Sequence, residues 1–121
     1  MNKTLPLLII ILLCFFPLVV QATEWVECYS DEYSLDFLVN PDSTEIIDFI
    51  FKIDEVKQES TKWLIEKRQI NFNDRTITFK AKANIPSLSN INLESREDTG
   101  ILTYGKRRHG LVCDWSSFFN N

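Results

Sequence analysis

The sequence predicts an all-β domain, a single compact antiparallel sandwich or flattened barrel of about eight strands over residues 23–121. Apolar side chains recur at every second position in several segments, which is the period of a half-buried strand. Turn-forming residues separate these segments at short intervals. No repeat, low-complexity segment or long Gly/Ser linker interrupts this part of the chain, so we expect one domain.

Residues 75–83 show the most regular alternation. The apolar residues at positions 77, 79, 81 and 83 fall on one face of the expected strand, and threonines and lysines fall on the other. Residues 33–39, 91–94 and 111–115 alternate in the same way. In the last of these segments, Leu111, Cys113 and Trp115 share a face.

Turn chemistry falls between the expected strands. Asn73-Asp74 separates residues 70–72 from the strand that begins at Arg75, which predicts a hairpin. The other expected turns are Asn40-Pro41-Asp42, the segment 84–90 with Pro86, Asp98-Thr99-Gly100, and the stretch from Gly105 to Gly110.

Residues 43–57 fit two structures. Their apolar side chains suit a helix at positions 46, 49, 50, 53 and 56, and a strand at positions 47, 49, 51 and 53. Asp42 and Glu45 would form a capping pair at the start of a helix. The β-branched and aromatic content of the segment favours the strand.

Residues 1–22 have the order of a secretory signal peptide. Lys3 gives a positive start, residues 5–20 are almost wholly apolar, and Val20-Gln21-Ala22 offers small residues at the cleavage positions. An uncleaved anchor fits less well, because the run contains two prolines and is shorter than the about 20 apolar residues of a spanning helix. A lipoprotein signal at Cys14 is disfavoured by Leu13. We therefore expect a periplasmic or secreted protein with no stable membrane anchor after cleavage.

Removal of the signal leaves two cysteines, Cys28 near the start of the domain and Cys113 near its end. An even number of cysteines in a small exported domain favours a disulfide, and the alternative is two buried thiols. Trp25 and Trp115 lie close to the two cysteines in sequence, and we expect both in the core. The cysteines and His109 lack the close spacing of a metal site, and no cofactor motif is present, so we expect neither a metal nor a cofactor.

Charge is divided unevenly along the chain. Residues 24–59 contain eleven acids and two bases, whereas residues 60–121 contain six acids and ten bases. One interpretation is that the two halves neutralise each other within one fold. The other is that the domain has an acidic face and a basic face, with separate partners.

The densest positive charge is the run Lys106-Arg107-Arg108-His109, bracketed by Gly105 and Gly110. The structural explanation is an exposed turn, which charged side chains keep soluble and keep from pairing with other edges. The functional explanation is contact with an anion, because adjacent arginines can fork around carboxylates or phosphates and an imidazole gains charge at mildly acidic pH. Nucleic acid is disfavoured, because the chain has a net charge of -4 and no aromatic residue interrupts the basic run.

A second basic cluster, Lys62, Lys67 and Arg68, surrounds Trp63. It fits a strand that buries Trp63 on one face and exposes its charged side chains to solvent on the other. A basic–aromatic contact surface is the alternative interpretation.

His109 is the one histidine of the chain and so the obvious candidate for acid–base chemistry. Glu66 is a possible carboxylate partner, as in acid–base nucleases with one His and one Glu. The sequence contains no nucleophile elbow, Gly-rich phosphate loop or metal-binding His motif. A hydrolytic enzyme is therefore the least favoured hypothesis.

The stretch from Ile91 to Leu102, with Cys113 downstream, resembles the C-terminal pattern of many small uncharacterised exported bacterial β-proteins: a strand, a Thr-Gly turn and a second strand. The resemblance covers roughly the last quarter of the chain and implies no activity. Thr99-Gly100 followed by Tyr104 is loosely similar to the inhibitory strand of the periplasmic lysozyme-inhibitor type, but the spacing differs, so no residue role follows.

These observations favour a non-catalytic exported binding or inhibitory module. Its partner would be an unknown protein or an anionic envelope component, and its contact residues would be Lys106, Arg107, Arg108 and His109. The alternative is a structural or envelope-accessory protein that acts through a sheet edge.

Overall fold

The computed structural model describes residues 24–40 and 44–119. The expected signal peptide and the Pro41-Asp42 part of the first expected turn lie outside the described residues. Strands account for most of the described chain, so the all-β prediction is confirmed. The strands are β1 (Glu24–Tyr29), β2 (Tyr33–Val39), β3 (Ile46–Ile53), β4 (Val56–Gln58), β5 (Trp63–Asn71), β6 (Thr76–Ala83), β7 (Ile91–Arg96), β8 (Thr99–Tyr104) and β9 (Arg107–Asp114), with a short 3-10 turn η1 (Ser60–Lys62) and a four-residue helix α2 (Ser116–Phe119).

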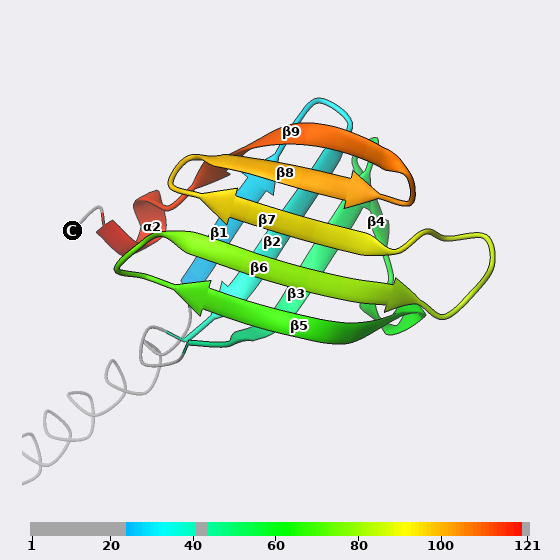
Figure 1. The fold of residues 1–121 in the computed structure, drawn as a ribbon, viewed down its shortest axis with the longest axis horizontal. Coiled ribbons are helices and arrows are strands. Elements are labelled where there is room, and N and C mark those ends of the chain that lie inside the picture. Colours follow the sequence, from blue (N-terminus) through cyan, green and yellow to red (C-terminus); the bar gives the residue numbers. More distant parts are fainter. Residues whose placement is uncertain (1–23, 41–43, 120–121) are drawn as a thin grey trace, which may run out of the picture.

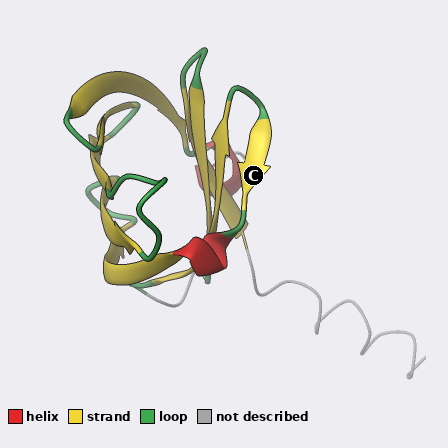
Figure 2. Ribbon diagram, turned by 90° about the vertical axis from the view of Figure 1, so that its right-hand side faces the viewer, coloured by secondary structure: helices red, strands yellow, loops and turns green. Residues whose placement is uncertain are grey.

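All nine strands belong to one antiparallel sheet, in the order β4-β3-β2-β1-β9-β8-β7-β6-β5. The sheet curls into a half-barrel, with β5–β9 in front of β1–β4 (Figure 1) and the two layers bending toward each other in the turned view (Figure 2). This arrangement is compatible with the predicted flattened barrel, with nine strands in place of about eight. No helix within the described ranges is long and apolar enough to cross a membrane.

Two meanders, β1–β4 and β5–β9, meet where β1 pairs with β9. This ladder contains three residue pairs: Glu27 with Asp114, Cys28 with Cys113, and Tyr29 with Val112. The predicted disulfide links its central pair across 85 residues of sequence. Both cysteines are buried, so the bond lies inside the half-barrel and ties its two layers together.

The two ends of the sheet approach each other at a seam between β3 and β5. The backbone N–H of Ile70 donates to the carbonyl of Thr44 (2.9 Å), and Glu45 forms an isolated bridge with Gln69. The Arg68 guanidinium lies 3.8 Å from the Glu45 carboxylate across the same seam. Farther along the seam, the contact between β3 and β5 is made by side chains. The Trp63 ring packs edge-on against the rings of Phe49 and Phe51.

Alternating burial follows the period that the sequence predicts. In β6, for example, Ile77, Phe79 and Ala81 are buried while the intervening side chains are more exposed. The interpretation of residues 43–57 as strand is confirmed by β3 and β4, and the helix alternative is wrong. The core residues are Val26, Cys28, Tyr33, Leu35, Phe37, Val39, Ile46, Phe49, Phe51, Trp63, Ile70, Ile77, Phe79, Ala81, Ile91, Leu93, Leu102, Leu111, Cys113 and Trp115.

The two tryptophans expected beside the cysteines differ in burial. Trp115 is buried, and its Nε1–H donates to the carbonyl of Glu97 (2.7 Å). Trp25 is 38% exposed, so its predicted place in the core is wrong. The cause is strand phase, since β1 buries Val26 and Cys28 and turns Trp25 to the other face.

Two expected turns are shorter than predicted. The turn between β7 and β8 consists of Glu97 and Asp98, and Gly100 belongs to β8. The turn between β8 and β9 consists of Gly105 and Lys106, and Gly110 belongs to β9. Both predictions placed glycine in a turn, whereas Gly100 and Gly110 have strand pairing.

Gly100 lies where the disulfide leaves no room for a side chain. A Cβ atom there would lie 3.1 Å from the Ser95 Cβ and 3.2 Å from the Cys113 Sγ, whereas one at Gly110 would meet nothing within 4 Å. We expect Gly100→Ala to lower the free energy of unfolding by about 1–3 kcal/mol through overpacking. Gly110→Ala should be neutral or raise it by up to about 1 kcal/mol.

Equilibrium urea unfolding of the two variants, followed by circular dichroism, tests this difference. The two substitutions add the same methyl group to extended strand positions, so Gly110→Ala controls for the chemistry of the change. Equal effects at the two positions would show that the disulfide does not restrict Gly100.

Candidate functional site

The β8–β9 hairpin carries the basic run on a turn of only two residues. Tyr104 and Arg107 form the last strand pair, and Gly105 between them has φ of 64°. A positive φ at the first turn residue, which glycine adopts easily, matches the twist of a two-residue hairpin. The Gly105 N–H donates to the carbonyl of Asn90 (3.0 Å), which fixes the hairpin against the β6–β7 loop. Lys106 therefore lies at the tip, and the next three residues lie in β9.

Strand alternation sends the two arginines to opposite faces of the hairpin. Arg108 lies opposite Thr103 on the outer face, whereas Arg107 has the phase of the buried Leu111 and Cys113. Both arginines are exposed, because the hairpin extends past the core. This geometry does not fit the hypothesis that the two adjacent arginines bind one anion between them.

His109 lies beneath the hairpin and not on its exposed tip. Its ring packs on Tyr33 with the centroids 4.5 Å apart, and its Nε2 atom is buried without a hydrogen-bond partner among the described residues. Tyr33 also contacts the rings of Phe51 and Tyr104. Burial raises the pKa of the Tyr33 phenol, as does the neighbouring Glu32 carboxylate, while Arg107 opposes the shift.

The β6–β7 loop covers the same end of the half-barrel. The Nε1–H of Trp63 donates to the carbonyl of Ser89 (2.9 Å), and the N–H of Ser89 donates to the Tyr104 hydroxyl (3.3 Å). Together with the aromatic contacts, these bonds make this end a packed structural region.

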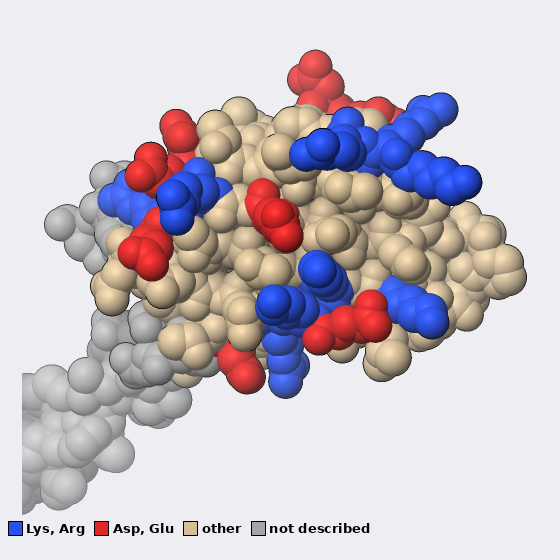
Figure 3. Space-filling model, viewed as in Figure 1, with Lys and Arg blue, Asp and Glu red and all other residues tan. Residues whose placement is uncertain are grey.

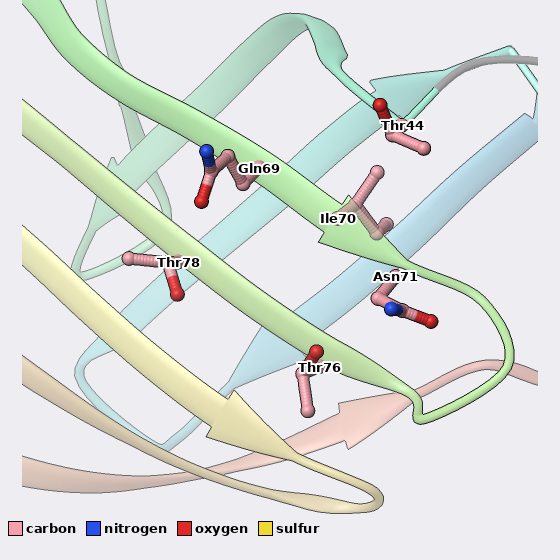
Figure 4. Close-up of a pocket in the computed structure, with 6 residues that line it drawn as sticks. All are labelled: Thr44, Gln69, Ile70, Asn71, Thr76 and Thr78. Atoms are coloured by element: carbon pink, nitrogen blue, oxygen red, sulfur yellow. The ribbon is translucent and has the colours of Figure 1, made fainter.

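One surface hollow is lined mainly by uncharged polar side chains. The hollow beside the seam (Figure 4) brings together the uncharged side chains of β5 and β6 and one residue before β3. Its lining is Thr44, Gln69, Ile70, Asn71, Thr76 and Thr78. Its lining contains no Asp, Glu, His, Lys or Cys side chain.

Glu66 and His109, the sequence-based candidates for acid–base chemistry, are not brought together. Glu66 is exposed at a bulge in β5, and His109 lies in β9 with β6, β7 and β8 between the two strands. Within residues 24–40 and 44–119, no group of three or more His, Cys, Asp or Glu side chains is placed to hold a metal ion.

The fold separates the acidic and basic halves of the sequence into its two layers. The described strands of the acidic half are β1–β4, and those of the basic half are β5–β9, so their outward-facing charges lie on opposite sides of the molecule. Figure 3 shows Lys and Arg side chains over the β8–β9 hairpin, over β5 and β6 and at the left of the view, with Asp and Glu side chains among them. The layer of β5–β9 therefore carries both signs of charge.

Three carboxylates are neighbours where β1 joins β2 and β9. Glu27 of β1 lies opposite Asp36 of β2 on one side and Asp114 of β9 on the other. Burial and the Glu27 charge raise the pKa of Asp36, and Lys52 partly offsets them. Hydrogen bonds from Ser116 lower the pKa of Asp114. Because the pKa of Asp36 is higher in the folded protein than in the unfolded chain, the free energy of unfolding decreases as the pH rises from the unfolded-state pKa through the folded-state pKa.

No known family model matches the chain, and comparison with curated proteins and with solved structures gave no significant match.

Sequence reasoning treated the two basic clusters as separate and did not assign Lys80, Asn92 or Thr103 to any site. The phase of β6 already indicated that Lys80 faces solvent. The strand register, which places these residues beside Arg108, is a property of the folded sheet.

Proposed function

We propose that the protein is a non-catalytic exported binding module that contacts an anionic partner through the tip of the β8–β9 hairpin. The observation that carries the proposal is the exposure of Lys106 in the two-residue turn and of Arg107 and Arg108 at the start of β9. Within the described ranges, the ion pair Arg68–Glu45 lies at the seam, and none involves these three side chains. Their charge is thus available to a partner.

Export is part of the proposal. It is supported by the signal-peptide pattern of residues 1–22 and by the Cys28–Cys113 disulfide, a bond that persists in oxidising compartments. We place the protein in the periplasm or outside the cell, where acidic proteins, cell-wall carboxylates and lipid phosphates are the available anions. His109 supports the hairpin from below and does not contact the partner directly.

Affinity capture from the native envelope and medium tests the hairpin contact. We expect Arg107→Ala/Arg108→Ala to retain about a tenth or less of the captured partner, since each charge-assisted hydrogen bond contributes about 1.5 kcal/mol or more. The melting temperature should be nearly unchanged because both side chains are exposed. Mass spectrometry identifies the partner, and circular dichroism checks the fold.

A matched control removes the same charge elsewhere. Lys57 and Arg96 are exposed and lie outside the hairpin, so Lys57→Ala/Arg96→Ala should capture the partner as well as the native protein does. Undiminished capture by the double arginine variant would end the hairpin proposal.

The second candidate is a structural or envelope-accessory role through a sheet edge. Val56 on β4 is 62% exposed and Leu64 on β5 is 60% exposed, and these strands are the two ends of the sheet. An added strand would use such edges for backbone pairing. This role predicts capture that tolerates the arginine substitutions and fails when proline replaces Leu64.

A further inference from the structure

The strand register aligns the two basic clusters in one row across the outer face of β5–β9. Lys67 pairs with Lys80, Lys80 with Asn92, Asn92 with Thr103, and Thr103 with Arg108. Alternation gives all five side chains the same face, because the residues beside them in β6–β8 (Phe79, Ala81, Ile91, Leu93 and Leu102) are buried in the core. We call Lys67, Lys80, Asn92, Thr103 and Arg108 the outer row.

The outer row is too long for a small anion. Adjacent strands lie about 4.8 Å apart, so Lys80 and Arg108 are separated by about 14 Å along the sheet, and the whole row spans about 19 Å. One carboxylate or phosphate group cannot contact both ends. Lys67 and Lys80 are directly opposite each other, which is an unfavourable pairing of like charges that a bound anion would relieve.

The middle of the outer row suits a ligand with hydroxyl groups. Asn92 and Thr103 are uncharged, partly exposed hydrogen-bonding residues, and with Arg108 they line a shallow hollow. Glu94 and Ile101 complete that lining. The Glu94 carboxylate can accept hydrogen bonds from sugar hydroxyls.

Aromatic side chains are missing from the outer row and from the row beside it, which contains Gln69, Thr78, Glu94, Ile101 and Gly110. Single-stranded nucleic acids depend on aromatic stacking for much of their binding. Membrane surfaces are bound by a broad apolar face flanked by cations. The outer row offers neither feature.

We propose that the outer row binds a linear anionic polysaccharide, whose acidic groups contact Lys67 and Lys80 at one end and Arg108 at the other. Sugar hydroxyls hydrogen-bond with Asn92 and Thr103 between them. This inference rests on the proposed function and names the class of its anionic partner.

Titration calorimetry on the secreted, disulfide-bonded protein tests the inference. The probes are a long oligogalacturonate fraction, a heparin fraction and the monosaccharide galacturonate. We expect at least one polymer to bind and the monosaccharide to bind more than about tenfold more weakly, because it reaches only one end of the row. The slope of log affinity against log salt should fall by about one for each cation removed from the row.

Lys57 provides a control, because it is exposed on β4 and lies outside both the outer row and the hairpin. Arg108→Ala and Lys67→Ala/Lys80→Ala should each weaken polymer binding about tenfold, and Lys57→Ala should weaken it less than about threefold. Equal losses for Lys57→Ala and Arg108→Ala would overturn the outer row.

Two further results would overturn the inference. The first is binding of neither polymer while the protein still captures an arginine-dependent partner from the envelope, which leaves the proposed function intact. The second is tighter binding to single-stranded DNA or to phosphatidylglycerol vesicles than to either polymer. Loss of arginine-dependent capture as well would remove the proposed function itself.

Discussion

Cys28→Ala/Cys113→Ala is expected to lower the free energy of unfolding by about 3–5 kcal/mol. The bond joins residues 85 positions apart, and closing a loop of this length removes about 4–5 kcal/mol of chain entropy from the unfolded state. Without it, three residue pairs hold β1 against β9. Small domains have a net stability of about 5–15 kcal/mol, so the loss would be a large part of the total.

Equilibrium urea unfolding followed by circular dichroism measures this loss. The native protein should show a comparable decrease when dithiothreitol is added, and the double alanine variant should not respond to the reductant. A decrease below about 1 kcal/mol in both comparisons would show that the β1–β9 ladder is stable without its cross-link.

Trp63→Ala is expected to have the second large effect, a decrease of about 3–5 kcal/mol. Its ring is 4% exposed and packs edge-on against Phe51 and Phe49, with centroids 5.6 Å and 6.5 Å away. Its Nε1–H also donates to the carbonyl of Ser89. Truncation would thus remove both the ring contacts across the seam and the hydrogen bond that holds the β6–β7 loop.

Two variants separate these contributions. Trp63→Phe keeps most of the packing and leaves the Ser89 carbonyl without its donor, so we expect a smaller decrease of about 1–3 kcal/mol. Trp25→Ala removes a tryptophan that is 38% exposed and should cost less than either. A similar decrease for Trp25→Ala and Trp63→Ala would contradict the role of Trp63 at the seam.

Most of the strands can be predicted from the sequence because alternating burial is a local property. Ile77, Phe79 and Ala81 show the period directly, and β6 has the expected phase. Turn boundaries are less predictable. Glycine is typical of turns, whereas Gly100 and Gly110 pair with residues of neighbouring strands in the folded sheet. The space at Gly100 is limited by Ser95 and by the Cys113 Sγ atom of the disulfide, which are contacts that only the folded sheet creates.

The candidate site was only partly predictable. The run Lys106-Arg107-Arg108-His109 is visible in the sequence, and so is the phase of Leu111 and Cys113. His109 lies two residues before Leu111, so the same alternation places it on the inner face. The predicted turn from Gly105 to Gly110 included His109 and therefore did not apply this alternation to it. The outer row depends on the registers of four strand pairs, and register is fixed by packing across the whole sheet.

The β1–β9 ladder also sets an order of events during biosynthesis. β1 is made before the other described strands, yet one of its two edges has no partner until β9 is complete. Until then Cys28 cannot form this bond, because its partner is made 85 residues later. Pairing of sequence-distant strands slows folding. A chain that stops before Cys113 is therefore chemically distinguishable from one that includes it, because Cys28 lacks its disulfide partner.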